Sequence, residues 1–387
     1  MPFISRKSFT PASYSSEFSQ QWSNPSDAFS VLLILGGDVV ARALAQLAGS
    51  RITPVAFSFG WVAYALAAVV NTFGENRLMP ATDCPCRVID GHAGYVRDNS
   101  SWVIGRMIRD FESWMDDGQL DGPIHRRMDE MIQEKWKIDK TPDPPPKAGL
   151  CVSIYKAKQA RPGHPGHDLV YFAGFATMIV QLGLAAIPCF LFGDWAVLLT
   201  TASGIALSLA MGSLPQWAEE KWACGRGTSK IIILTRGNGS QHAIVVISDG
   251  KGLDLEHLAA SGSASFRSLK TRCTVLILAA LWILLLISAA GIQKNTWFLL
   301  AIGSIGMFDN IFAAGATRTP DDFGVPLEFV EVIGHRKVMQ VLFEVECRYP
   351  RVGKSMLATF FPGNLRQDEI DKWDELNKLA EGTKEEQ

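Results

Sequence analysis

The chain has 387 residues, of which 48% are hydrophobic, and its mean hydropathy is +0.11. This composition is too apolar for an ordinary soluble enzyme, and the charged residues gather in separate segments, which is typical of a multi-pass membrane protein with sizeable aqueous loops. The formal net charge of -2 gives no reason to expect a nucleic-acid partner.

Six stretches are long enough to cross a bilayer, which takes about 20 mainly apolar residues. They are 28–49, 52–72, 169–192, 195–214, 273–292 and 296–317. We therefore expect an α-helical polytopic membrane protein, a six-span helical bundle with a small mixed α/β cytosolic layer. An even number of spans places both termini on the same side of the membrane.

The basic residues predict the orientation. Of the 37 Lys and Arg residues, 34 lie in the tails and the two long loops, which the positive-inside rule places in the cytosol. The segment before the first span has no apolar core, so we expect no cleaved signal. We also expect the protein to lie in the endoplasmic-reticulum membrane. The predicted organisation is a cytosolic tail (1–27), two spans (28–72), a cytosolic loop region (73–167), two spans (168–214), a cytosolic loop with a β-hairpin (215–272), two spans (273–317) and a cytosolic C-terminal region (318–387).

The first span carries two opposite charges near its middle, Asp38 and Arg42. They are four residues apart, so on a helix they lie on one face and can pair. Because charges in lipid are costly, we expect that face to point into the protein. A structural ion pair and a functional role are equally compatible with this pattern.

The second span contains three aromatic residues, Phe57, Trp61 and Tyr64, at the spacing of one helical face. Such a stripe more often packs in a core than lines a substrate cavity. The span ends with Glu75 at the cytosolic surface, where a carboxylate is usually solvated. In the following loop, Cys84 and Cys86 with the single His92 do not have the spacing of a zinc site.

Two cytosolic segments have recognisable secondary structure. The segment 100–115 predicts an amphipathic helix whose Trp and Arg side chains suit a membrane surface. The sequence KIIILTRGNGSQHAIVVIS places two β-branched apolar runs around a Gly-rich turn, which predicts a β-hairpin. Two strands alone cannot bury their apolar faces, so we expect CVSIY and LEFVEV to join the same sheet.

The sixth span again holds polar residues, Asp309 and Asn310, in an apolar run. Gly303 and Gly306 on the same span would allow another helix to approach closely. We expect Asp309 to face the Asp38/Arg42 pair across the bundle, with the first and sixth spans as neighbours.

Three segments resemble members of one fungal family: GGDVVARALAQ, FSFGWVAYAL followed by GENRLMP, and RYPRVGKSMLATFFPGNLRQDE. The chain resembles the membrane-bound terpene cyclases of ascofuranone-type meroterpenoid biosynthesis. The resemblance implies an isomerase-type cyclase that opens a terminal epoxide on a lipophilic prenylated aromatic substrate and closes a ring, without cofactor or metal. It also implies association with other membrane enzymes of such a pathway. No catalytic signature carries individual residues over.

Epoxide opening needs a protonated carboxylic acid and an apolar, aromatic cavity. Asp309 is the first candidate for the acid because burial favours its protonated form, and Glu75 is the second. Asp38, held by Arg42, would act as base or orienting group. Phe57, Trp61, Tyr64 and Asn310 are the candidate substrate-binding residues.

Two other classes of function remain open on the sequence alone. A metabolite transporter or exporter would also mark its path with charges inside the membrane. A membrane adaptor would use its cytosolic loops to bind partners and would not depend on Asp38 or Asp309.

Overall fold

The computed structural model describes residues 26–119, 121–140, 142–147, 149–163, 166–261 and 268–385, so the predicted tail 1–27 lies almost entirely outside the described residues. The chain forms two compact units. The helical unit contains the described residues of Met1–Leu78, His167–Trp217 and Phe266–Ala316. The sheet unit contains those of Met79–Gly166, Ala218–Ser265 and Thr317–Gln387.

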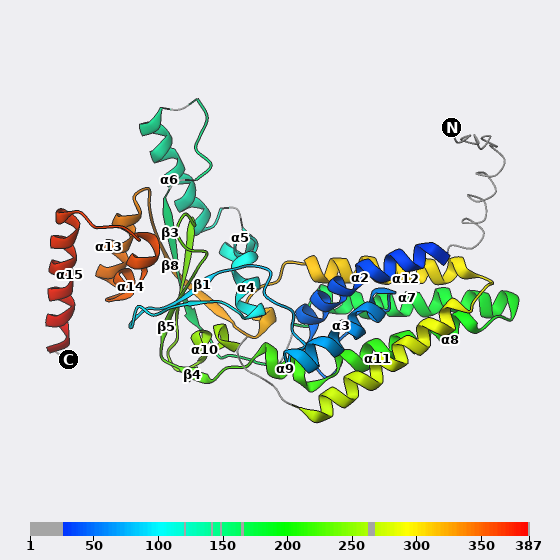
Figure 1. Cartoon of the computed structure of the whole chain (residues 1–387). Helices are drawn as coiled ribbons and strands as arrows, with labels where there is room; N and C mark the ends of the chain where they lie inside the picture. Colours follow the sequence, from blue (N-terminus) through cyan, green and yellow to red (C-terminus); the bar gives the residue numbers. More distant parts are fainter. Residues whose placement is uncertain are drawn as a thin grey trace, which may run out of the picture. The chain divides into compact units, whose positions relative to one another are not determined.

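Six helices make up the helical unit (Figure 1): α2 (Ser26–Leu47), α3 (Gly60–Gly74), α7 (Leu169–Phe192), α8 (Ala196–Gly212), α11 (Leu269–Ala290) and α12 (Thr296–Gly315). Within the described residues, α7, α11 and α12 are long and apolar enough to cross a membrane. Together with α9 (Pro215–Lys221), from which it is separated by a 43° bend, α8 would provide a fourth span. A membrane protein is thus supported, whereas six continuous spans are not confirmed.

The predicted span over 52–72 is not a single helix. Residues 53–59 are not helical, and the helix that follows, α3, has only 15 residues. Every residue of this non-helical segment 53–59 is buried inside the helical unit. Pro54 lies within the segment and Gly60 is the first residue of α3, and both residue types disfavour a helix interior.

Glycines on three helices make room for the segment 53–59. A Cβ atom added at Gly174 of α7 would lie 1.9 Å from the Pro54 carbonyl oxygen, and one at Gly306 of α12 would lie 1.8 Å from the Phe57 oxygen. Gly204 of α8 similarly faces the Phe57 ring. Gly306 therefore permits close approach, as the sequence predicts, but the backbone that approaches is non-helical.

The sheet unit is built on a six-stranded mixed sheet in the order β2-β1-β5-β6-β3-β8. Its strands are β1 (Arg87–Asp90), β2 (Val96–Asp98), β3 (Leu150–Ala157), β5 (Ile231–Thr235), β6 (His242–Ile247) and β8 (Leu327–His335). Strands β5 and β6 form the predicted hairpin, β3 pairs with β6 in parallel, and β8 pairs with β3 antiparallel. The predicted partners CVSIY and LEFVEV are thus confirmed. A second, two-stranded sheet joins β4 (Arg226–Thr228) to β7 (Gly252–Leu253).

Helices cover both faces of the six-stranded sheet (Figure 1). One face packs on α4 (Trp102–Arg109), α5 (Phe111–Trp114) and α10 (Leu255–Ala259), and the start of α6 (Pro123–Asp139) packs at the same core. The other packs on α13 (Val338–Arg348), α14 (Val352–Phe360) and α15 (Gln367–Glu385). Burial on both faces explains why β5 and β6 are continuous apolar runs and not alternating ones.

The predicted helix at 100–115 exists as α4 and α5, but it is not a membrane-surface helix. Trp102 is 3% exposed and Arg106 is fully buried, with its guanidinium group stacked on the Trp102 ring and 3.1 Å from Asp83. Amphipathic periodicity is the same for a helix on lipid and a helix on a sheet, so the sequence pattern could not separate the two.

Candidate functional site

The Asp38/Arg42 ion pair forms as predicted, with 2.9 Å between Arg42 Nε and an Asp38 carboxylate oxygen. The Asp38 side chain is, however, 69% exposed and that of Arg42 44% exposed. The buried face of α2 carries Val40, Ala43 and Leu44 instead. The prediction that the pair faces the interior of the helical unit is therefore wrong, because both side chains lie on its surface.

Asp309 lies half-buried on α12, next to the hydroxyl group of Thr177 on α7, which hydrogen bonds to it. The helices α2 and α12 are neighbours, as expected, since the Met307 side chain approaches Gly36. Asp309 nevertheless has its hydrogen bond on α7, so the described contacts do not bring it together with Asp38 and Arg42. Glu75 is exposed at the C-terminal end of α3.

The three predicted aromatic residues are buried in the core of the helical unit. The Trp282 ring of α11 stacks on Trp61 at 5.5 Å and on Phe57 at 6.2 Å between centroids, and Tyr64 packs edge to face on Trp61 at 5.6 Å. Phe57 lies in the non-helical segment and the other two lie on α3, so they do not share a helical face. These contacts are those of a packed core.

Asn310 and Gln181 hold the non-helical segment. The Asn310 side-chain amide donates to the Ala56 carbonyl at 3.1 Å and to the Ser58 hydroxyl at 3.1 Å, while Gln181 donates to the Phe57 carbonyl at 2.6 Å. An unpaired carbonyl group in an apolar interior is costly, so these amides supply what a helix would have supplied. Asn310 is thus explained by the backbone and needs no substrate.

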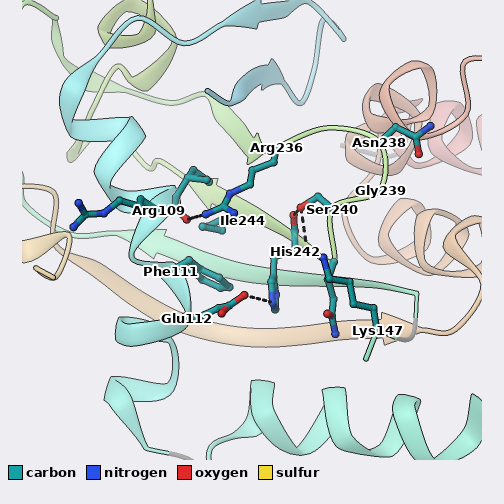
Figure 2. Close-up of a pocket in the computed structure, with 12 residues that line it drawn as sticks. Arg109, Phe111, Glu112, Lys147, Arg236, Asn238, Gly239, Ser240, His242 and Ile244 are labelled. Atoms are coloured by element: carbon teal, nitrogen blue, oxygen red, sulfur yellow. Dashed lines mark hydrogen bonds and ion pairs between the residues drawn. The ribbon is translucent and has the colours of Figure 1, made fainter. Parts of the chain in front are cut away.

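The clearest arrangement of ligand-binding groups is in the sheet unit, in a cavity of about 240 Å³ at the β5–β6 loop (Figure 2). We call it the His242 cavity. Its lining comes from three separate segments: the end of α4 with α5, the residue Lys147 before β3, and the loop with the start of β6. The polar and charged lining residues are Arg109, Glu112, Lys147, Arg236, Asn238, Ser240, Gln241 and His242.

The loop between the strands is held in a defined shape. Gly237 and Gly239 have φ of 95° and 83°, a conformation that favours glycine. The Thr235 and Ser240 hydroxyls both donate to the His242 carbonyl oxygen, at 3.2 and 2.9 Å. The turn therefore fixes the position at which the His242 ring enters the cavity.

The His242 imidazole is a largely buried group in the wall of the cavity. Its side chain is 14% exposed, packs edge to face on Phe111 at 5.1 Å, and lies 4.0 Å from a Glu112 oxygen (Figure 2). Neither ring nitrogen has a hydrogen-bond partner among the described residues. The pKa of His242 is lowered to about 4, mainly by burial; Glu112 raises it, and the nearby Arg236 and Lys147 lower it.

This pKa decides what His242 can do. A general base works best when its pKa is near the working pH, and an imidazole with a pKa of about 4 is a weak base. The lowered pKa therefore makes His242 a poor general base near pH 7.

The balance of charge in the cavity is positive. Arg109 is neutralised by a two-point contact with Asp110, at 2.5 and 2.9 Å. Arg236 is exposed, and its guanidinium group donates a hydrogen bond to the Ile108 carbonyl at 3.3 Å. It has no carboxylate partner among the described residues. Lys147 is also exposed, and Glu112, which is 79% exposed, is the one acidic residue of the lining.

The loop cysteines Cys84 and Cys86 are both buried. Within the described residues, no three His, Cys, Asp or Glu side chains come together as metal ligands would. Burial raises the pKa of the Cys86 thiol to about 12, whereas a metal-binding or redox thiol needs a low one.

The chain matches no family model, no curated protein and no solved structure. The function of the His242 cavity therefore has to be inferred from the geometry of its lining residues. The sequence reasoning recognised the RGNG hairpin but missed the His242 cavity, since the residues that complete it are far away in the chain.

Proposed function

We propose that this chain is an integral membrane protein whose sheet unit binds a small oxyanion, a phosphate-like or carboxylate group, in the His242 cavity. One observation carries the proposal: Arg236, Lys147 and His242 line one cavity, and the exposed Glu112 is the single acid of its lining. Phosphate recognition depends on such cationic and N–H donors. The volume of about 240 Å³ is below that of most drug-sized pockets, which suits one or two anionic groups.

The test is a binding titration of the full chain in detergent with inorganic pyrophosphate. Arg236→Gln should weaken binding about tenfold, since hydrogen bonds to charged groups contribute roughly 1.5 to 3 kcal/mol. The control, Arg226→Gln, removes the same charge from an exposed position outside the cavity and should leave binding unchanged. Absence of saturable binding, or equal effects of the two substitutions, would contradict the proposal.

A second function, terpene cyclisation, is supported by Asp309 and by the resemblance to the fungal cyclases. Asp309 is a half-buried carboxyl group on an apolar helix, and it forms no ion pair among the described residues. In this proposal Asp309 donates the proton that opens an epoxide on a lipophilic prenylated substrate. The exposed Asp38/Arg42 pair and the packed aromatic core are no longer part of it.

The cyclase proposal is tested in microsomes that contain the chain and prenylated phenol epoxides. A cyclase gives products of unchanged mass, and Asp309→Asn should abolish them. If Asp309→Asn keeps full turnover, Glu75 takes its place as the acid, and Glu75→Gln is the next variant. Movement of unaltered substrate across sealed vesicles would favour the transporter, and no effect on substrate would favour the adaptor.

We also propose that the sheet unit faces the cytosol, because its segments contain most of the Lys and Arg residues. Glycosylation sites placed in the exposed β4 turn at Gly225 and Gly227 should remain unmodified in microsomes. Glycosylation at these sites would show that the sheet unit lies on the opposite side of the membrane.

A further inference from the structure

A second cavity of the sheet unit has the opposite character to the His242 cavity. It has a volume of about 690 Å³ and lies where β3, β8 and the turn η1 (Met115–Gly118) meet. Its charged residues are mainly acidic: Asp116, Asp117, Lys158, Asp321 and Glu328. We call it the Tyr155 cavity.

Three aromatic rings form one wall of the Tyr155 cavity. Tyr155 packs edge to face against Trp114, with 5.4 Å between centroids, and against Phe329, at 5.6 Å. Aromatic faces attract cations, and they attract alkylated ammonium ions in particular. The wall therefore offers both apolar surface and a preference for positive charge.

The Tyr155 hydroxyl group is a buried polar group without a partner. Tyr155 is 4% exposed, and its hydroxyl has no hydrogen bond among the described residues. Burial raises the pKa of Tyr155, and the carboxylates of Asp116 and Asp117 raise it further. A buried hydroxyl is normally paired, so Tyr155 is an unusual residue in the wall of this cavity.

The acids of the Tyr155 cavity are not all used by the protein. Asp116 accepts hydrogen bonds from the Ile124 and His125 amides and so caps α6. Glu328 lies 3.7 Å from Lys158. Asp117 and Asp321 are exposed, and neither pairs with a cation among the described residues.

The cavity combines the unpaired carboxylates of Asp117 and Asp321 with an aromatic wall. This combination suits a positively charged ligand that also has apolar groups. A metal ion does not fit, because among the described residues no three His, Cys, Asp or Glu side chains form a ligand set. The volume of about 690 Å³ is also that of an organic-ligand pocket. We infer that the Tyr155 cavity binds an organic ammonium ion, with its charge near Asp117 and Asp321 and its alkyl groups against Trp114 and Phe329.

The test is a titration of the full chain in detergent with choline. The matched neutral ligand is 3,3-dimethyl-1-butanol, which has the same shape without the charge. Choline should bind saturably, and the neutral analogue should bind at least tenfold more weakly. Equal binding of the two ligands, or no saturable binding of choline, overturns the inference.

The matched variants locate the site. Asp117→Asn combined with Asp321→Asn should weaken choline binding about tenfold, and asparagine tolerates the left-handed backbone of Asp117, whose φ is 54°. Asp374→Asn makes the same change at an exposed position of α15 outside the cavity, and Arg236→Gln alters the His242 cavity. Both should leave choline binding unchanged. Unaltered binding in the double variant, with unfolding temperatures equal to the parent, also overturns the inference.

Discussion

The helical unit and the sheet unit use buried polar groups in different ways. In the helical unit, Gln181 and Asn310 are buried, and their amide nitrogens donate to the backbone of the non-helical segment 53–59, while their amide oxygens have no hydrogen-bond partner among the described residues. In the sheet unit, the His242 ring and the Tyr155 hydroxyl likewise have no hydrogen-bond partner among the described residues, and both residues line a cavity. Buried polarity, paired or unpaired, is thus not by itself a sign of a ligand site. The sign is a polar residue that lines a cavity.

The largest effect should come from the close contact between α12 and the non-helical segment. In Gly306→Ala the new Cβ would lie 1.8 Å from the Phe57 carbonyl oxygen and 2.8 Å from its carbonyl carbon, so backbone atoms must shift. We expect the free energy of unfolding to fall by about 4 kcal/mol or more, which would appear as a loss of folded protein in size-exclusion chromatography in detergent. Gly183→Ala on α7, where no atom lies within 4 Å, is the control and should fold normally.

Removing the Gln181 amide should lower the free energy of unfolding by a smaller amount. The Gln181 Nε2 donates to the Phe57 and Ile302 carbonyls, at 2.6 and 3.0 Å. Ile302 lies within α12 and keeps a helical donor, but Gln181→Leu leaves the Phe57 carbonyl of the non-helical segment unpaired in an apolar interior. The cost should be about 3 kcal/mol, measured as a lower thermal unfolding temperature. Gln293→Leu, at an exposed position, should not change it. A stable Gln181→Leu protein would show that the amide is not needed for the segment, and the contrast between the units would fail.

The third prediction concerns the pH dependence of the sheet unit. The pKa of His242 in the folded chain is about 4, against an ordinary value of 6.5, so the unfolded chain takes up this proton first as the pH falls. The free energy of unfolding should therefore decrease between pH 6.5 and 4, by up to about 3 kcal/mol at the acid end.

Unfolding measured over this pH range isolates the contribution of His242 when the parent is compared with two variants. His242→Asn should flatten the acid limb, whereas His257→Asn, which removes an exposed histidine, should not. Parallel pH profiles for all three proteins would mean that His242 is not buried in its neutral form.

The parts of the fold that could be predicted are those encoded locally. The β-branched runs on either side of RGNG define β5 and β6, and the need to cover two apolar strands led correctly to β3 and β8. The apolar run at 52–72 misled because hydropathy does not distinguish a helix from a buried non-helical segment. The glycines that accommodate the segment, such as Gly174 and Gly306, lie on other helices and have no local signal.

The site was harder to predict for the same reason. Asp38 and Arg42 stood out because charge is rare in apolar runs, yet their pair is exposed. His242 did not stand out, since one histidine at the start of a strand is unremarkable until Lys147 and Glu112 are brought next to it. A cavity built from three distant segments can be recognised only after the chain is folded.

The most direct test of the central claim is to locate a bound oxyanion in an experimental structure of the full chain with tungstate, whose scattering is strong. We predict density in the His242 cavity, within hydrogen-bonding distance of Arg236 and the His242 ring. The sheet unit has another cavity of about 410 Å³ with basic residues, lined in part by His92, Arg351 and Lys354. Tungstate in that cavity with none at His242, or no ordered tungstate at all, would contradict the account.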